Sequence, residues 1–344
     1  MDRKTQILAD AIRDRLEQGE VSEINDALLV NLSTEIENGA VMNPAGVPLG
    51  LALYAGRPGA PGLFFDDGDM RAAIKSFTRP RDGRECIHIV APELVDPKRQ
   101  RSFVEKLTAV GDAVKNTGAY KDSYVRYISE QRRDMLLQSG RWGRVDNSNG
   151  WIENCPHEDE EYPQLLVRLK SQDLPVQLSY NSSENLRKVT NRLKKGDKVF
   201  CWKPLEDFEL AVGRIAKHFE NIQKEREVVG SCALDYELLC RTGAKLQGRK
   251  GVFALVGYLN DEPVSVFICQ QYAPGEVAVF SSITLRERGT LQNLPLYVFM
   301  ELFSYLRDRK VETVNLLGCE TESLFDYKRK FGDETRRSTW AIYR

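Results

Sequence analysis

The segment 251–284 constrains the fold more than any other part of the chain. It holds three apolar runs, at 251–258, 264–269 and 277–284, which are rich in valine, isoleucine and phenylalanine. Such residues are favoured in β-strands. The connections at 259–263 and 272–276 contain the Asn, Asp, Pro and Gly residues typical of hairpin turns. The segment therefore predicts an antiparallel meander of three strands.

Helix and strand patterns flank this meander on both sides. Upstream, Asn181-Ser-Ser-Glu184 has the pattern of a capping box and predicts a helix over 181–195, followed by a strand at 198–202. Apolar residues spaced four and three apart predict a second helix over 208–222. Downstream we expect a helix at about 291–309, a strand at 312–317, a short helix near 323–330 and a strand at 338–343.

The first half gives a mixed pattern of helices and strands. Helical periodicity covers 3–18 and 22–37, residues 85–91 form a predicted strand, and 98–117 form a predicted helix. A polar stretch from Gly140 to Pro163 separates this half from the next. Because 344 residues exceed one ordinary core, we expect two domains, at 1–160 and 176–344, in an α+β protein.

Composition excludes several classes of protein. The formal net charge of −1 argues against a general nucleic-acid binder, and no run of apolar residues is long enough to span a membrane. The N-terminal segment resembles an amphipathic helix and not a secretion signal, so we expect a cytoplasmic protein. Seven scattered cysteines and three histidines predict neither a disulfide framework nor a metal site.

Two motifs near the C-terminus resemble a known group of enzymes. The predicted order of elements in the second half is similar to that of the GNAT acyltransferase fold. Val314-Asn-Leu-Leu-Gly318, followed by Leu324-Phe-Asp-Tyr-Lys328-Arg-Lys-Phe331-Gly332, resembles the C-terminal signature of the Fem peptidoglycan aminoacyltransferases and of the soluble domain of phosphatidylglycerol lysyltransferases. The resemblance implies tandem GNAT-like (acyl-CoA N-acyltransferase) domains, the second clear and the first degenerate.

The donor implied by this resemblance is aminoacyl-tRNA, used as a co-substrate without a bound cofactor. GNAT enzymes that use acyl-CoA hold its pyrophosphate on a Gly-rich loop before a helix. The matching segment begins with Arg286 and Gly289, but Leu291 stands where Gly or Ala would allow close approach. This partial match favours tRNA and leaves a CoA thioester as the alternative donor.

The same resemblance implies a catalytic role for Lys328. Transfer from a tRNA ester to an amine passes through an oxyanion, which a fixed cation stabilises. Tyr327 is the aromatic neighbour of this lysine, and Glu320, Glu322 or Asp326 could deprotonate the attacking amine. On the residues alone, the favoured interpretation is that Lys328 belongs to a solvated basic helix end and the acids to the surface.

The helix predicted at 181–195 is a candidate contact for tRNA phosphates. Its apolar face excludes most of its cations, which are Arg187, Lys188, Arg192, Lys194 and Lys195. Clustered cations suit phosphates, although ordinary surface helices also carry lysines. At the end of the third meander strand, Ser281 and Ser282 are candidates for a donor and acceptor pocket together with Arg286 and Glu320, or simple packing residues.

These observations support three hypotheses about function. The first is an aminoacyl-tRNA-dependent transferase that forms an amide on a small soluble amine acceptor, such as a natural-product intermediate, because the chain has no membrane span to bring it to a lipid. The second is an acyl-CoA-dependent N-acyltransferase. The third is a non-catalytic GNAT-like module that binds RNA.

Overall fold

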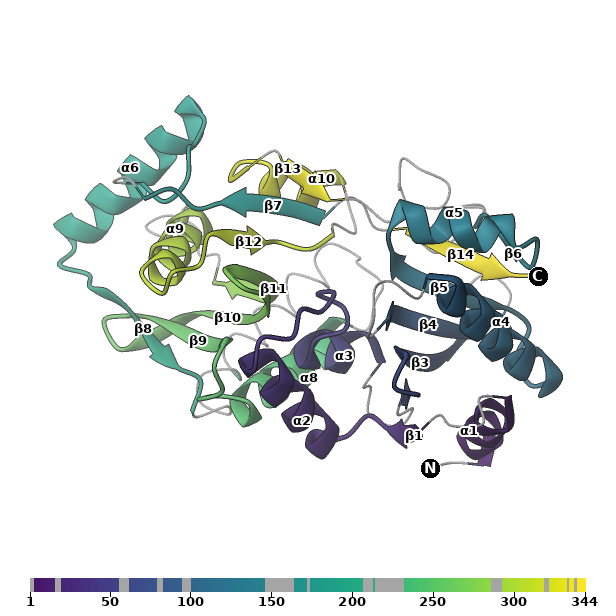
Figure 1. The fold of residues 1–344 in the computed structure, drawn as a ribbon. Helices are drawn as coiled ribbons and strands as arrows, with labels where there is room; N and C mark the ends of the chain where they lie inside the picture. The colour runs from purple at the N-terminus through teal and green to yellow at the C-terminus, as the bar shows by residue number, and fades with distance from the viewer. Residues whose placement is uncertain are drawn as a thin grey trace.

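The computed structural model describes residues 3–15, 20–55, 62–78, 83–94, 100–145, 164–171, 174–206, 213, 232–285, 293–318, 322–332, 334–336 and 339–344. These residues form two seven-stranded sheets, each with helices packed against it (Figure 1). Within the described residues, no helix is long and apolar enough to cross a membrane.

The first sheet has the strand order β1-β2-β3-β4-β5-β14-β6. Its strands β4 and β5 run parallel, and the other neighbours in it are antiparallel. The strands are β1 (Glu20–Glu23), β2 (Leu63–Asp66), β3 (Met70–Thr78), β4 (Glu85–Leu94), β5 (Ser123–Ile128), β14 (Thr339–Tyr343) and β6 (Trp142–Gly143).

The second sheet has the order β8-β9-β10-β11-β12-β7-β13 and again contains one parallel pair, β11 with β12. The strands β9, β10 and β11 form the antiparallel meander expected from the sequence. The strands are β8 (Phe200–Pro204), β9 (Val252–Leu259), β10 (Glu262–Ala273), β11 (Glu276–Thr284), β12 (Thr313–Asn315), β7 (Gln164–Arg168) and β13 (Glu334–Arg336).

The two halves repeat one order of elements and exchange one strand. Strands β1 to β6 of the first sheet correspond in order to β8 to β13 of the second. The strand that follows β6, β7, lies beside β12 in the second sheet, and the strand that follows β13, β14, lies beside β5 in the first. The segment 338–343 was predicted to belong to the second half, and this was wrong because β14 completes the first sheet.

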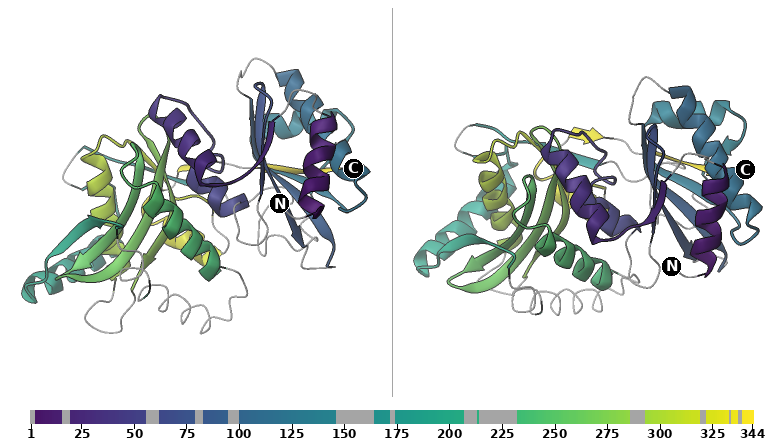
Figure 2. Two further views of the ribbon diagram at one scale, coloured as in Figure 1. Left: turned by 90° about the horizontal axis from the view of Figure 1, so that it is seen from below. Right: turned by 60° about the horizontal axis from the view of Figure 1, so that its bottom comes forward.

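The helices cover the sheets as follows. In the first half, α1 (Arg3–Arg15) and α4 (Gln100–Asn116) pack on one face of the first sheet. Helices α2 (Asp26–Glu37) and α3 (Pro48–Ala55) lie between the two sheets, where their apolar residues join the core of the second half (Figure 2). The remaining helices are α5 (Glu130–Gln138), α6 (Tyr180–Lys195), α8 (Cys232–Lys245), α9 (Leu294–Arg307) and α10 (Glu322–Lys328).

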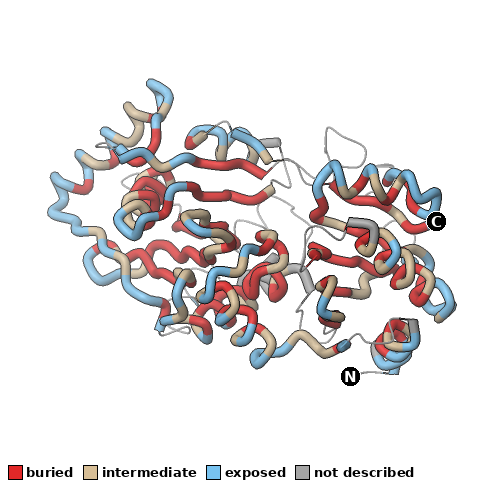
Figure 3. The backbone as a smooth tube through the Cα atoms, in the orientation of Figure 1, coloured by how far each residue is buried: buried red, intermediate tan, exposed pale blue. Residues whose placement is uncertain are grey.

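Each sheet is buried along its central strands, and the exposed residues lie mainly on the outer faces of the helices (Figure 3). The largest fully buried side chains include Trp142 and Trp340 in the first half and Phe267 and Phe303 in the second. Burial of such aromatic side chains is a major source of folding free energy. One core cluster lies within the first half and β14, and a larger cluster joins the second half to first-half residues such as Phe64 and Tyr127.

One local prediction differs in detail and another cannot be compared. Helix α6 begins after Ser179, whose side chain accepts a hydrogen bond from the Ser182 amide, so the N-cap lies two residues before Asn181. The expected capping box is therefore wrong, and Glu184 contacts cations of the same helix instead. Most of the helix expected at 208–222 lies outside the described residues.

Candidate functional site

Lys328 is held against the segment that follows β12. Its Nζ donates hydrogen bonds to the carbonyl oxygens of Leu316 at 2.6 Å and Gly318 at 2.8 Å. Phe331 follows helix α10 and is 2% exposed. Its ring centre lies 4.9 Å from that of Phe299 on α9, so it packs the end of α10 against α9. The ammonium group is thus fixed in place and partly buried, and does not point into bulk water.

The lysine lies where β11 and β12 separate. Their parallel pairing extends only from Glu276 with Thr313 to Ala278 with Asn315, whereas β11 continues to Thr284. Leu316 follows Asn315 of the last pair directly, and Gly318 lies two residues further along the chain. The register with β10 also shifts between Val279 and Ser281, so β11 carries a bulge at the same point. Bulges interrupt ladder pairing and re-aim side chains, often beside active sites.

The other predicted catalytic and pocket residues differ in exposure, and two of them lie outside the described residues. Tyr327 packs its ring 5.7 Å from Phe331, and Asp326 is exposed on α10. Ser281 is partly exposed and Ser282 is exposed, both on β11 beyond its pairing with β12. Arg286 and Glu320 lie outside the described residues. The structure therefore gives Lys328 a defined position, and the roles of the other six residues remain predictions.

Helix α6 carries its cations on an exposed face, as expected. Val189 and Leu193 are buried, and the five cations Arg187, Lys188, Arg192, Lys194 and Lys195 are exposed. At the N-terminal end of the helix, Glu184 accepts from Arg187 at 3.0 Å and lies 3.5 Å from Lys188. The hydrogen bond from Arg187 lowers the pKa of Glu184. This carboxylate partly neutralises its two neighbours, so the C-terminal end of α6 offers the stronger positive field.

A second candidate site, which the sequence did not indicate, is a cavity of about 370 Å³ between the two halves. Its walls come from the segments 41–44 and 127–129 of the first half and from Gln164, Tyr272, Ala273, Glu276 and Arg336. These residues are distant in sequence, and only the packing of the two sheets brings them together. No spacing rule for short motifs could have grouped them.

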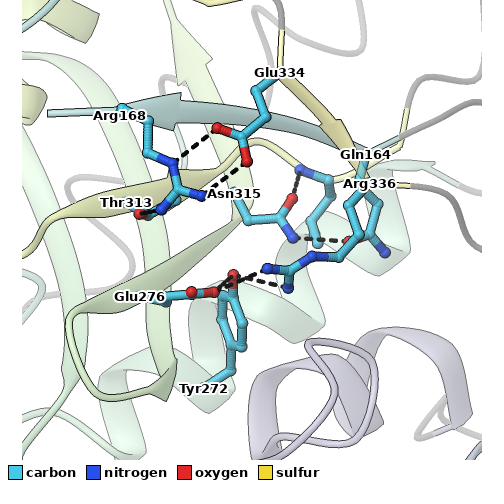
Figure 4. Close-up of polar contacts among 9 residues, drawn as sticks. Gln164, Arg168, Tyr272, Glu276, Thr313, Asn315, Glu334 and Arg336 are labelled. Carbon is cyan, nitrogen blue, oxygen red and sulfur yellow. Dashed lines mark hydrogen bonds and ion pairs between the residues drawn. The ribbon is translucent and has the colours of Figure 1, made fainter.

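An ion pair lies in the wall of this cavity. Arg336 on β13 donates through Nη2 to Oε2 of Glu276 at 3.2 Å and through Nη1 to the Tyr272 hydroxyl at 3.3 Å (Figure 4). The Tyr272 hydroxyl also donates to Glu276 Oε2. Burial, followed by the hydrogen bond with Glu276, raises the pKa of Tyr272, so the phenol remains protonated as a donor.

A chain of amides joins this cavity to the segment that holds Lys328. The buried side chain of Asn315 donates to Gln164 Oε1 at 2.8 Å and accepts from the Leu317 amide at 2.8 Å (Figure 4). Leu317 has a left-handed backbone, with φ of 58°, between the two carbonyl groups that Lys328 contacts. The Asn315 side chain therefore holds the left-handed turn at Leu317, next to the carbonyl groups that accept hydrogen bonds from Lys328.

In the first half, the corresponding parallel strands β4 and β5 separate beside a partly buried carboxyl group. Glu93 accepts a hydrogen bond from the backbone amide of Asn43, a residue that lines the cavity. Burial raises the pKa of Glu93 to about 7, against the opposing effects of that hydrogen bond and of Arg132 and Arg71. Its proton can therefore be exchanged near neutral pH. The described residues contain no group of three or more His, Cys, Asp or Glu side chains that could hold a metal ion.

Comparison with known proteins supports the fold. No protein-family model and no curated protein sequence matches the chain. Among solved structures, FemX matches with a TM-score of 0.57 at 11% identity, covering 94% of this chain and 97% of that one. L-PGS from Bacillus licheniformis matches with a TM-score of 0.57 at 12% identity, covering 94% and 93%.

A third solved structure shares the arrangement of two tandem halves. A tandem GNAT protein from the clavulanic acid biosynthesis pathway aligns with a TM-score of 0.51 at 10% identity, covering 94% of this chain and 98% of that one. The fold is that of tandem GNAT proteins. Both the Fem-like resemblance and the α+β fold expected from the sequence are confirmed, and the two separating strand pairs, β4–β5 and β11–β12, are the matching features of the two GNAT-like halves.

Proposed function

We propose that the protein is an aminoacyl-tRNA-dependent transferase that forms an amide on a small soluble amine acceptor. The observation that carries this proposal is the position of Lys328, an ammonium group fixed by two carbonyl oxygens where β11 and β12 separate. The structural matches to FemX and L-PGS support it at the level of the fold.

The chemistry requires little from the protein beyond position and charge. The amine attacks the ester carbonyl carbon, and the carbonyl oxygen becomes negative. The bond between this carbon and the ribose oxygen then breaks, the nitrogen loses a proton, the ribose oxygen gains one, and the amide forms. An ester and an amine react directly once they are held together. A cation that is already in place stabilises the developing oxyanion without reorganising, and such a group is worth about 10²- to 10³-fold in rate. Lys328 would supply this charge.

The basic face of α6 would hold the tRNA. Its five cations are exposed, whereas Val189 and Leu193 of the same helix are buried. Lys194 and Lys195 occupy the last turn of this helix, away from Glu184. Contacts of this kind bind phosphates with a strong dependence on salt concentration and without regard to sequence.

An incubation with total charged tRNA and a panel of amines tests the proposal. We expect the aminoacyl ester to be consumed only when protein and a suitable amine are both present, and ribonuclease treatment of the tRNA to abolish product formation. Acyl-CoA substrates serve as the comparison. Product formation from acyl-CoA, with thermal stabilisation by CoA and no effect of ribonuclease, would replace the proposal with the acyl-CoA alternative.

A further inference from the structure

We propose that the cavity between the two halves is a binding site for a free α-amino acid with an apolar side chain, whose carboxylate lies at Arg336 and whose ammonium group lies at Glu276. The proposal concerns binding alone and does not depend on the transferase activity. It rests on the charge, the hydrogen-bonding groups and the apolar surface of the cavity wall.

The charges of the wall favour a ligand with no net charge. Arg336 and Glu276 are the two charged residues among the described residues that line the cavity, and they form a pair with an N–O distance of 3.2 Å. An α-amino acid carries its own opposite charges one carbon apart, which is close to the same spacing. Each charge of the ligand can therefore lie beside its opposite in the wall, and neither partner is left with an unbalanced charge.

The polar groups around this pair retain hydrogen-bonding capacity. Gln164 is 5% exposed, and among the described residues nothing accepts from its Nε2, because only its Oε1 is used, by Asn315. Glu276 takes both of its hydrogen bonds on Oε2, so no described residue donates to its Oε1. Neither atom is among the described buried polar atoms that lack a partner, so both are accessible to solvent or to a ligand. These two atoms match a carboxylate oxygen and an ammonium hydrogen.

Much of the described cavity lining is apolar. Val41, Met42, Pro44, Ile128 and Ala273 form this part. A hydrocarbon side chain on the ligand would cover this surface, and burial of apolar area contributes about 25 cal/mol per Å². The volume of about 370 Å³ lies at the small end of the range for ligand sites, which runs from about 300 to 1,000 Å³. A small metabolite fits these dimensions better than a nucleotide cofactor.

Calorimetry with simple probes tests the site in the absence of tRNA. The panel consists of glycine, L-valine, L-leucine, L-methionine and L-phenylalanine at pH 7.5, together with 4-methylpentanoate and isopentylamine, which retain only the negative or only the positive charge of leucine. We expect saturable binding of at least one apolar amino acid. The singly charged analogues should bind at least about tenfold more weakly, because each brings an unbalanced charge to a wall whose two charges already compensate each other.

Charge variants give a change in selectivity that misfolding cannot produce. In Glu276→Gln the wall gains a net positive charge, so preference should move from the amino acid to 4-methylpentanoate. In Arg336→Gln it should move to isopentylamine. Matched controls come from the neighbouring pair Arg168–Glu334, whose N–O distance is 2.8 Å and which lies outside the cavity lining. Arg168→Gln and Glu334→Gln should keep the wild-type order of affinities.

A third variant leaves the charges unchanged. Ala273→Met places a longer side chain in the cavity and should abolish amino-acid binding while keeping the wild-type melting temperature within a few degrees. The proposal is overturned if no amino acid of the panel gives saturable heat up to about 10 mM, which is beyond the weak end of specific small-ligand affinity. It is also overturned if binding is unchanged in Ala273→Met, or if the two charge variants keep the wild-type order of affinities.

Discussion

At Lys328 a single ammonium group contacts two backbone carbonyl oxygens and lies at the proposed reaction centre. The substitution Lys328→Met should lower the rate of aminoacyl transfer by about 100-fold or more, because the oxyanion loses its cation. It should also lower the free energy of unfolding by about 1 to 3 kcal/mol, because the carbonyl groups lose their donor. Single-turnover transfer assays and urea unfolding measure the two effects separately.

Lys330→Met is the matched control for this variant. Lys330 is exposed, two residues away, and its Nζ lies 5.0 Å from the centre of the Tyr327 ring. This substitution removes the same charge from the same segment without removing a donor to Leu316 or Gly318, so transfer should remain within about threefold of wild type. Equal loss of transfer in both variants would show that the rate depends on the net charge of this segment and not on the position of Lys328.

Glu93 predicts a pH dependence of stability. Its pKa is raised from 4.5 to about 7 by burial, so the folded protein favours the protonated carboxyl group. This contribution is fully present below about pH 4.5, falls as the pH rises and is lost above about pH 7. The shift corresponds to a contribution on the order of 3 kcal/mol.

In Glu93→Gln this contribution should no longer change with pH. We expect the difference in unfolding free energy between variant and wild type to move in favour of the variant as the pH rises from 5 to 8, measured by urea unfolding at each pH. A difference that stays constant across this range would show that Glu93 is ionised in the folded protein throughout.

At the scale of single elements, α6 predicts the salt dependence of tRNA binding. Reversing the charges of Lys194 and Lys195 to glutamate should weaken binding about tenfold or more and reduce the slope of log K against log salt by about 1.5 to 2. Filter binding at several salt concentrations measures both quantities. Arg241→Glu on α8 is the control, because Arg241 is also an exposed helical cation. An unchanged slope in the double variant would remove α6 from the tRNA interface.

The sequence predicted elements whose signal is local. The meander of β9, β10 and β11 and the apolar face of α6 were found because side-chain periodicity and turn residues lie within a few positions of each other. The N-cap of α6 was misplaced because three serines at 179, 182 and 183 and Asn181 all have capping side chains. The backbone angles of Ser179, not its residue type, decide which of these residues caps the helix.

The sequence could not predict features that depend on distant pairing. The segment 339–343 has the pattern of a strand, but nothing in it indicates whether it pairs with β5 or with β12. The cavity was missed for the same reason, since Asn43, Ser129 and Glu276 come together only after the two halves pack. The signature around Lys328 was visible in the sequence because its residues lie close together. The division at 1–160 and 176–344 remains a proposal about chain segments, given the exchange of β7 and β14.

At the scale of the whole molecule, the exchange of strands predicts which half a destabilising substitution near the C-terminus affects. Trp340 on β14 is fully buried, beside Tyr124 of β5. The substitution Trp340→Ala should lower the free energy of unfolding by about 3 to 5 kcal/mol. Hydrogen exchange should then increase in β5 and β6 of the first half more than in β9 to β11. An increase confined to the second half would contradict the pairing of β14 with β5.

The most direct measurement of the central claim follows a radiolabelled amino acid from tRNA to an amine. Wild-type protein should move the label into an amide product in a reaction that ribonuclease prevents, and Lys328→Met should form this product at least about 100-fold more slowly while Lys330→Met forms it normally. Label that remains on tRNA with every amine, or that moves equally fast in Lys328→Met, would contradict the account.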